Sequence, residues 1–245
     1  MLPFAFFIFA CTTESVTDPS PLVWQGWVYE DIPTEETLGL EQGTMVMTPM
    51  NGGTPIEGEQ TDPNRLGNWS FSIEPNQEVQ IRVDGPEHIP TVWRARTPHA
   101  NAYWYSGSLF AVRSDTFELF LDGLAELTGD DQTEDHEETV MLYGEPLPLT
   151  ESDLDAWTDA QIWVYDSEGG VHQATTLVLD EETGGLMLSA PEPAPIAAFV
   201  ATGIAPGAVS LVVDASDGRS TAVEYRAEAG ELVSAFAFTL PWGQP

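Results

Sequence analysis

Short runs in which apolar and polar residues alternate recur along the chain, separated by clusters of Gly, Pro, Asn and Asp. The clearest run, Glu78 to Val83 (EVQIRV), alternates charged or amide side chains with valine and isoleucine. Successive side chains of a β-strand point to opposite faces, so this pattern predicts a strand with one buried and one solvated face. Many short strands with turn residues between them predict an all-β fold of mostly antiparallel sheets packed as sandwiches. Further runs of this kind lie at residues 44–48, 67–73, 161–165, 208–213 and 231–238.

The two halves of the chain resemble each other. Residues 73–96 (IEPNQEVQIRVDGPEHIPTVWRAR) align with 204–226 (IAPGAVSLVVDASDGRSTAVEYR), and TMVMTPMNGG (44–53) resembles QIWVYDSEGG (161–170). Internal similarity of this extent predicts a duplicated unit. We therefore expect two tandem β-sandwiches, over residues 22–113 and 139–245. One constant spacing pairs Val79 with Val209, Asp84 with Asp214, Thr91 with Thr221 and Arg96 with Arg226.

One segment between the halves has the periodicity of a helix. From Asp115 to Thr128, large apolar residues recur at helical spacing and form a single stripe, while acidic residues occupy the other side. Asp115 is the expected N-cap with Glu118 in the capping-box position, and Gly129 suits the C-terminal stop. We expect a short amphipathic helix which, with the acidic linker behind it, connects the two sandwiches over residues 114–138. The stripe consists of Phe117, Phe120, Leu121, Leu124 and Leu127.

A frame of three segments in the first half carries a family resemblance. The segments are GWVYEDIP, GTMVMTP and GNWSFSIEPNQEVQIRVDGPEHIPTVW, and together they are similar to carboxypeptidase-regulatory-like, or transthyretin-like, domains over residues 24–96. A weaker echo covers residues 139–227, and the chain resembles in particular the acidic two-repeat lipoproteins of myxobacteria. The resemblance implies two immunoglobulin-like (transthyretin-like) sandwiches without a catalytic centre. Because a shared fold does not carry function with it, the function must be argued from the residues themselves.

The first residues predict export and lipid attachment. Leu2 to Ala10 (LPFAFFIFA) is too short to span a bilayer as a helix, but it has the length of a signal-peptide core. Ile8 to Cys11 (IFAC) resembles the bacterial lipobox, which implies cleavage before Cys11 and acylation of its thiol. The alternative is a leader cleaved elsewhere. We expect a signal peptide at 1–10, a flexible tether at 11–21 and a lipid-anchored protein of the cell envelope, with Thr12 compatible with the outer membrane of a Gram-negative bacterium.

The charge of the chain excludes several classes of partner. There are 40 acidic residues against seven basic ones, all of them Arg, and the formal net charge is −33. Nucleic acids and anionic lipid headgroups are recognised through Lys and Arg, so both would be repelled, and membrane contact is expected through the lipid anchor only. Repulsion opposes the compact state, so we expect salt to stabilise the protein. A single cysteine allows no internal disulfide.

The sequence carries no recognisable catalytic motif. It lacks a Gly-x-Ser-x-Gly elbow, a His-Glu-x-x-His helix, a phosphate-binding loop and a Cys-x-x-Cys pair. Loop-capping roles in apparent turns are expected for the four histidines, of which His88, His99 and His136 lie beside Pro, Glu or Asp and His172 follows a Gly-Gly pair. We expect a non-enzymatic protein without a cofactor, with a structural, adhesive or partner-binding role and an envelope protein or a glycan as its partner.

Three residue clusters keep a ligand-binding alternative open. The run after the helix holds Asp130, Asp131, Glu134 and Asp135, an oxygen-rich set of the kind that Ca²⁺ prefers, although a solvated linker is the simpler explanation because the spacing of an EF-hand loop is missing. The same two interpretations apply to Asp153, Asp155 and Asp159. The aromatic run Tyr103, Trp104 and Tyr105 predicts either a stacking platform for sugars or packing in the core of a sandwich. The alternative function is therefore a carbohydrate- or Ca²⁺-binding module on the cell surface.

Overall fold

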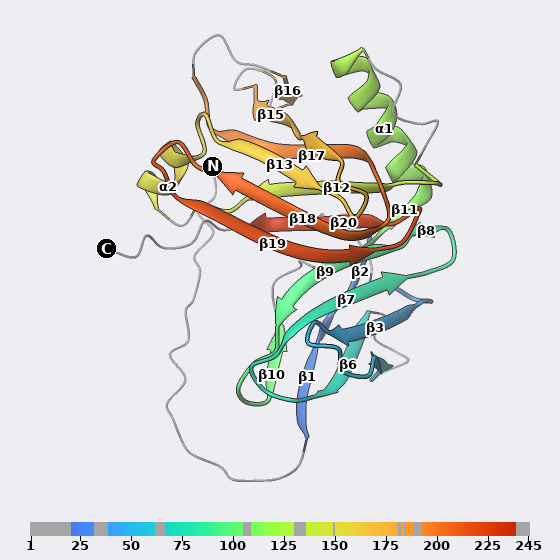
Figure 1. The fold of residues 1–245 in the computed structure, drawn as a ribbon. Helices are drawn as coiled ribbons and strands as arrows, with labels where there is room; N and C mark the ends of the chain where they lie inside the picture. Colours follow the sequence, from blue (N-terminus) through green and yellow to red (C-terminus); the bar gives the residue numbers. More distant parts are fainter. Residues whose placement is uncertain are drawn as a thin grey trace.

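The computed structural model describes residues 21–31, 39–61, 67–104, 109–129, 136–148, 150–180, 183, 185–188 and 193–238. Strands dominate, as the alternating pattern predicted (Figure 1). The strands of the first half are β1 (Leu22–Trp27), β2 (Tyr29–Glu30), β3 (Thr44–Pro49), β4 (Ile56–Glu57), β5 (Glu59–Gln60), β6 (Asn68–Ile73), β7 (Glu78–Asp84), β8 (His88–Ile89), β9 (Thr91–Arg96), β10 (Ala102–Trp104) and β11 (Phe110–Arg113). Helix α1 (Ser114–Thr128) follows.

The second half contains one further helix, α2 (Glu151–Ala156), and nine strands in the described residues. These strands are β12 (Val140–Pro146), β13 (Gln161–Tyr165), β14 (Val171–Gln173), β15 (Thr175–Leu179), β16 (Leu186–Met187), β17 (Ile196–Ile204), β18 (Gly207–Asp214), β19 (Ser220–Ala227) and β20 (Leu232–Phe238). Each of the six predicted strand runs is a strand, namely β3, β6, β7, β13, β18 and β20. The prediction of a mainly β fold is confirmed.

The described strands form four sheets, and the largest runs through both halves of the chain. Its order is β16-β15-β17-β12-β20-β9-β7-β3-β4, and the halves meet where β20 pairs in parallel with β9 (Figure 1). A sheet of order β10-β1-β6-β5 belongs to the first half, and one of order β14-β13-β18-β19 belongs to the second. The fourth sheet has the order β2-β11-β8. The backbone therefore joins the two halves by strand pairing as well as by the covalent chain.

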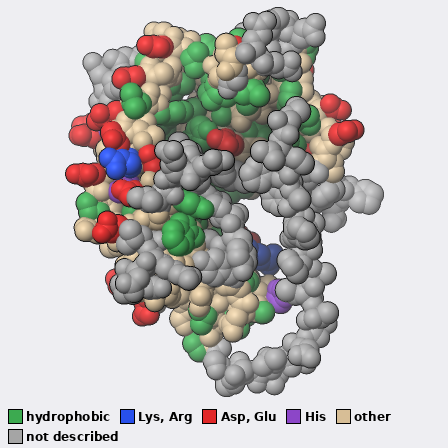
Figure 2. All heavy atoms as spheres, turned by 180° about the vertical axis from the view of Figure 1, so that it is seen from behind, with side chains coloured by type: hydrophobic (Ala, Val, Ile, Leu, Met, Phe, Trp, Pro, Cys, Tyr) green, Lys and Arg blue, Asp and Glu red, His purple; other side chains and the backbone are tan. Residues whose placement is uncertain are grey.

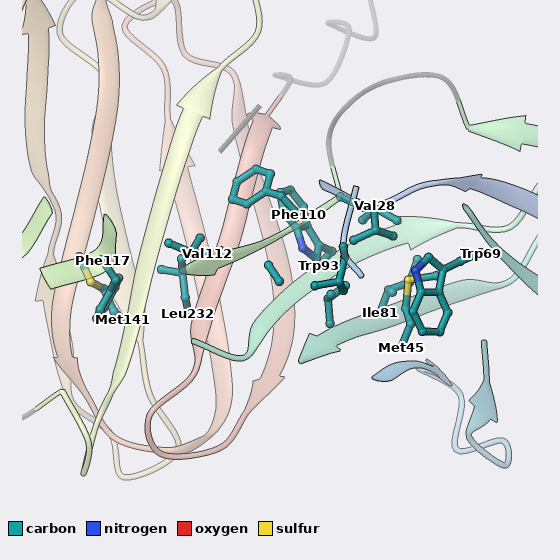
Figure 3. Close-up of a cluster of buried hydrophobic side chains, with 14 of the residues drawn as sticks. Val28, Met45, Trp69, Ile81, Trp93, Phe110, Val112, Phe117, Met141 and Leu232 are labelled. Carbon is teal, nitrogen blue, oxygen red and sulfur yellow. The ribbon is translucent and has the colours of Figure 1, made fainter. Parts of the chain in front are cut away.

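The sheets bury their apolar faces against one another. In the first half, Met45 and Met47 of β3 and the alternate residues of β7 share one hydrophobic cluster with Trp69 and Phe71 of β6. This cluster continues through Phe110 and Val112 into the second half, where it takes in Leu232 and Met141 (Figure 3). A second cluster fills the space between the sheet of β13, β18 and β19 and the strands β12, β17 and β20.

The two halves repeat the same strand order and the same register. The order β9-β7-β3-β4 in the first half matches β19-β18-β13-β14 in the second, and β10-β1-β6-β5 matches β20-β12-β17-β15. Thr44 pairs with Asp84 in the first half, and Gln161 pairs with Asp214 in the second. Glu78 likewise pairs with Arg96, and Ala208 pairs with Arg226. These registers agree with the alignment of the two sequence segments, residue for residue.

Helix α1 confirms the predicted stripe in part, because Leu127 is exposed, and it does not confirm the predicted cap. Phe117, Leu121 and Leu124 are buried in the first hydrophobic cluster with Leu177 and Val200, so the helix packs on the outer face of the second-half sheet. Gly129 ends the helix in the left-handed conformation, as expected.

The N-cap of α1 is Arg113, and its side chain makes no capping hydrogen bond. The Asp115 carboxylate accepts hydrogen bonds from the Arg113 guanidinium, at 3.0 and 3.1 Å, and from the Thr116 N–H. The prediction of Asp115 as N-cap is therefore wrong, because Arg113 engages this carboxylate and places it inside the first turn.

Candidate functional site at the junction of the two halves

We use the term junction for the contact of β20 and residues 224–231 with β7 and β9. At its centre Val233 lies opposite Val92, and Leu232 donates its N–H to the carbonyl of Pro90 at 2.9 Å. Val92 and Val233 are both fully buried in the second hydrophobic cluster. A first-half strand thus contributes a side chain to the core of the second half.

An ion pair closes one side of the junction. Arg82, on the face of β7 that points away from the first-half core, places its Nε at 2.5 Å from Oε1 of Glu231. Its Nη1 lies at 3.0 Å from the Asp84 carboxylate. Glu231 is buried, and its second oxygen accepts the N–H of Glu228. Burial acts to lower the pKa of Arg82, but the hydrogen bond and charge of Glu231 outweigh it, so the pKa is raised.

Polar side chains of the first half also cover part of an exposed strand edge. The Gln80 amide donates to the carbonyl of Arg226 at 2.6 Å and accepts its N–H at 2.8 Å. Arg94 donates from Nη1 to the carbonyl of Glu224 at 2.5 Å. These groups belong to β19, which has a neighbouring described strand on one side only. Unpaired edge groups invite further strands, so Gln80 and Arg94 act here as edge caps.

A groove of about 470 Å³ lies beside these contacts. Its walls are the outer face of β3 and β7 and the ends of β18 and β19, and they include Val46, Thr48, Arg82, Ala208, Arg226 and Glu231. Arg82, Gln80 and Glu231 are engaged with partners across the junction. The contacts of these lining residues therefore hold the two halves together.

Acidic side chains are spread over the visible surface, and basic ones are few (Figure 2). Of the arginines in the described residues, five form ion pairs with neighbouring carboxylates: Arg82, Arg94, Arg96, Arg113 and Arg219. The scarce positive charge is thus used within the molecule, and the surface left to a partner is predominantly acidic.

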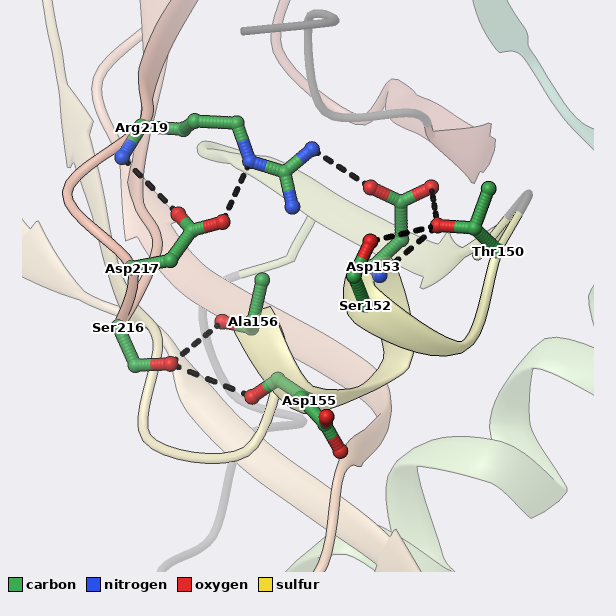
Figure 4. Close-up of polar contacts among 8 residues, drawn as sticks. All are labelled: Thr150, Ser152, Asp153, Asp155, Ala156, Ser216, Asp217 and Arg219. Carbon is green, nitrogen blue, oxygen red and sulfur yellow. Dashed lines mark hydrogen bonds and ion pairs between the residues drawn. The ribbon is translucent and has the colours of Figure 1, made fainter.

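Arg219 ties α2 to the β18–β19 turn (Figure 4). Its Nη1 lies at 2.6 Å from Asp153 of α2, and its Nε lies at 2.7 Å from Asp217. The hydrogen bond to Asp153 raises the pKa of Arg219. Thr150 caps the helix by accepting the N–H of Asp153, and its hydroxyl donates to the carboxylate of the same residue. Asp153 is therefore a structural ion-pair partner in this structure.

A half-buried carboxylate holds the β13–β14 turn. Asp166 lies at 2.9 Å from Nε2 of His172 and accepts backbone N–H groups of Glu168, Gly170 and Ala205. The hydrogen bond with His172, helped by these N–H groups, lowers the pKa of Asp166 to about 2. His172 lies in strand β14 and not in a turn, but its side chain has the expected loop-capping role.

The residues predicted from sequence to bind ligands are not brought together by the described structure. Cys11, Asp130, Asp131, Glu134, Asp135 and Tyr105 lie outside the described residues. Tyr103 and Trp104 belong to β10, whose backbone pairs in parallel with β1, while the positions of their side chains are not described. Within the described ranges, no group of three or more His, Cys, Asp or Glu is arranged to hold a metal ion. No helix there has the length and apolar character needed to cross a membrane.

The junction residues were missed by sequence reasoning for a definite reason. Gln80 and Arg82 occupy the polar positions of the alternating run, which predicted only a solvated face. Glu231 immediately precedes a strand, and nothing local marks it as buried. Their roles depend on a partner surface from the other half of the chain.

No protein-family model matches the sequence, and no curated protein matches it. Among solved structures, the chain is similar to the Bacillus anthracis TIE protein, with 10% identity and a TM-score of 0.27, over 90% of this chain and 34% of that one. The chain thus spans about a third of the length of that protein.

Two pilin structures also show similarity. GBS52, the minor pilin of the gram-positive pathogen Streptococcus agalactiae, has 8% identity and a TM-score of 0.25, over 91% of this chain and 98% of that one. The shaft pilin SpaA of Lactobacillus rhamnosus GG has 10% identity and a TM-score of 0.24, over 92% and 99%. Likeness at this level says nothing about what the chain does.

Proposed function

We propose that this chain is a non-enzymatic, lipid-anchored protein of the cell envelope with a structural role. In this proposal two copies of one immunoglobulin-like sandwich form a single rigid body, held at the membrane through Cys11. The junction is the observation that supports the proposal most strongly. One sheet and one hydrophobic cluster run through both halves, and polar groups between them fix their orientation.

The duplication of the unit is supported by the matched strand orders and registers. Two unrelated sandwiches could share a strand order by chance. Here the equivalent pairs Thr44–Asp84 and Gln161–Asp214 also share the register that the sequence alignment requires. A slip of one residue would move every side chain to the opposite face, so a shared register is a demanding match.

The non-enzymatic part of the proposal is supported by how three buried or half-buried carboxylates are used. Glu231, Asp153 and Asp166 are each engaged with Arg, His or backbone N–H groups that hold loops and strands together. A catalytic acid or base needs access to a substrate, and these groups are committed to structure. The acidic surface favours an envelope protein or a glycan over nucleic acid as a partner.

The anchoring part can be tested on the full chain in a Gram-negative host. Mass spectrometry of the membrane fraction is expected to find an N-terminal peptide that begins at Cys11 and carries acyl chains. The C11A variant is the control and is expected to carry none. An unmodified thiol on released protein would contradict the anchor.

The rigid-body part can be tested by hydrogen exchange in a urea series. Peptides from β7 and from β18 are expected to lose protection at the same urea concentration, because one sheet links them. Weakening the junction by Arg82→Ala is expected to separate the two midpoints. Separate midpoints in the unmodified protein would show that the halves are independent.

A further inference from the structure

The junction joins two different surfaces, one from each half of the chain. Because the halves repeat the same unit, each half contains a counterpart of both surfaces. The second half supplies the strand β20, and the first half supplies the edge of β9 together with the outer face of β7 and β3. By the matched strand orders, β10 is the counterpart of β20, and β19 is the counterpart of β9. Among the described strands, β10 and β19 both lie at sheet edges. Within one molecule these two counterparts do not meet.

The registers of the two halves specify how the remaining edges would pair. Leu22 lies opposite Ile73, and their counterparts Val140 and Ile204 are also opposite each other. Two residues further on, Trp24 pairs with Ala102 and Leu142 pairs with Val233. Ala102 is therefore the counterpart of Val233.

The partner strand follows from the same comparison. Val233 lies opposite Val92 in the junction, and the spacing that relates Val79 to Val209 makes Ala222 the counterpart of Val92. A junction repeated between molecules would place Ala102 of one copy opposite Ala222 of another.

The edge of β19 is open at this point. Its outward backbone groups belong to alternate residues, because Gln80 and Arg94 bind Arg226 and Glu224. Ala222 is the next residue in this alternation, and within the described structure its outward N–H and C=O have no hydrogen-bond partner. Gln80 and Arg94 therefore cap one end of the β19 edge. The other end, which corresponds to the part of β9 that pairs with β20, is not capped by the described residues.

The described residues also leave the outer face next to this edge uncovered. In the first half, Val46 and Thr48 of that face line the junction groove. Their counterparts in the second half are Trp163 and Tyr165 of β13, and Tyr165 is 41% exposed. Val171, directly opposite Tyr165 on β14, is 57% exposed. Exposed aromatic and aliphatic side chains on a sheet face mark a surface that a partner can cover.

We propose that molecules of this protein associate head to tail, with β10 of one copy added in parallel to β19 of the next. The first half of one copy then covers the sheet face of its neighbour that carries Tyr165 and Val171. In the same way, the second half covers the outer face of β3 and β7 within each molecule. Such an interface joins two different surfaces, so each copy can bind one neighbour at each end and the association can extend from copy to copy. The inference rests on the duplicated unit of the proposed function. Because each copy carries a net charge of −33, association is expected to strengthen with salt.

Cysteine cross-linking in cells tests the register directly. Full-length A102C and A222C chains are co-expressed and oxidised, and a disulfide-linked dimer is expected only when both are present, because adjacent strands bring the Cα atoms within disulfide range. Cys11 is common to every sample, so wild-type cells control for it. Co-expression of A102C with L186C, which places the thiol on the distant β16 edge, is expected to give no dimer.

A second variant tests the covered face. Adding Tyr165→Glu to the A222C chain buries an uncompensated carboxylate in the interface, and the dimer yield is expected to fall at least about tenfold. Adding Leu186→Glu is the matched control and leaves the yield unchanged. Absence of the A102C–A222C dimer, or an equal yield with L186C, would overturn the proposal. Failure of the cross-linking test would not affect the proposed function, because acylation of Cys11 and the coincident urea midpoints of the two halves are measured independently of association.

Discussion

Three carboxylates define how single residues work in this protein: Glu231 and Asp153 are buried, and Asp166 is half-buried. Glu231 and Asp153 are each held by an arginine, and Asp166 is held by a histidine and three backbone N–H groups. A buried charge is costly unless it is paired and hydrogen-bonded, so each of these residues makes the surrounding structure dependent on its partners. In a chain with 40 acidic residues, the few arginines determine which carboxylates can be buried.

Replacing Arg82 by alanine should expose the importance of this pairing. The R82A change leaves the Glu231 carboxylate buried without its cation, and we expect the free energy of unfolding to fall by about 3 kcal/mol. Urea denaturation at pH 7 measures the change. R96A is the control, since Arg96 is 67% exposed and lies at 3.8 Å from Glu78, and it should cost no more than about 0.5 kcal/mol. Equal losses in both variants would contradict a special role for Arg82.

Asp166 should make stability depend on pH in a defined range. Its pKa in the folded state is about 2, below the ordinary value of 3.8, so the ionised form stabilises the fold. That contribution is present above pH 4 and is lost as the pH falls towards 2. Asp166→Asn should therefore cost about 2 kcal/mol at neutral pH, because one acceptor oxygen is replaced by a donor, and the cost should shrink over this range.

The measurement for Asp166 is the difference in unfolding free energy between wild type and D166N across pH 2 to 6. Taking the difference removes the contribution of the other acids. Asp122→Asn on the exposed side of α1 is the control and should change stability by less than about 0.5 kcal/mol. A D166N cost that stays constant with pH would refute the assignment.

At the scale of elements, close packing between neighbouring strands is the main constraint. Gly144 of β12 lies opposite Phe199 of β17, and a Cβ at Gly144 would meet the Phe199 ring at 2.2 Å. The ring cannot move aside easily, because it stacks on Trp157 at a centroid distance of 6.3 Å. Gly123 in α1 has no heavy atom within 4 Å of the same position. The two glycines thus differ in packing and form a matched pair.

Alanine substitutions at these glycines should have opposite effects. Gly144→Ala forces Phe199 out of its place and should cost about 3 kcal/mol or more, as overpacked cores do. Gly123→Ala removes backbone entropy from the unfolded chain and should stabilise by about 0.5–1 kcal/mol. Thermal and urea denaturation of both variants measure the effects. A harmless G144A variant would show that the β12–β17 contact is looser than described.

At the scale of the whole molecule, the net charge of −33 opposes the compactness that the shared sheet requires. Salt shortens the range of charge repulsion from about 10 Å at 0.1 M to about 3 Å at 1 M. Repulsion is stronger in the folded state because its charges are closer together, so screening favours that state.

Thermal melts across a NaCl series should therefore show a midpoint that rises with salt. Choline chloride at equal ionic strength is the control and should give the same rise, because screening depends on ionic strength and not on the identity of the cation. A flat or falling midpoint would contradict the argument. A rise with NaCl alone would indicate cation binding instead of screening.

Local patterns accounted for most of the secondary structure and for none of the junction. The alternation in β7 and the apolar stripe of α1 predicted their elements because each depends on near neighbours along the chain. The repeat alignment relates the register of β3 with β7 to that of β13 with β18, and the two registers match. The cap of α1 was misassigned because an arginine two residues away competes for the Asp115 carboxylate.

The amino-acid order determines the strand pattern, the repeated unit and the acidic surface, since these follow from periodicity, similarity and composition within the chain itself. The placement of β20 beside β9, the burial of Glu231 against Arg82 and the opening of the groove were decided only by the tertiary structure. An alternating strand carries the same local pattern whichever neighbour it pairs with. Its partner is selected by how the two halves bury their apolar faces together, and that requires the three-dimensional shape of both.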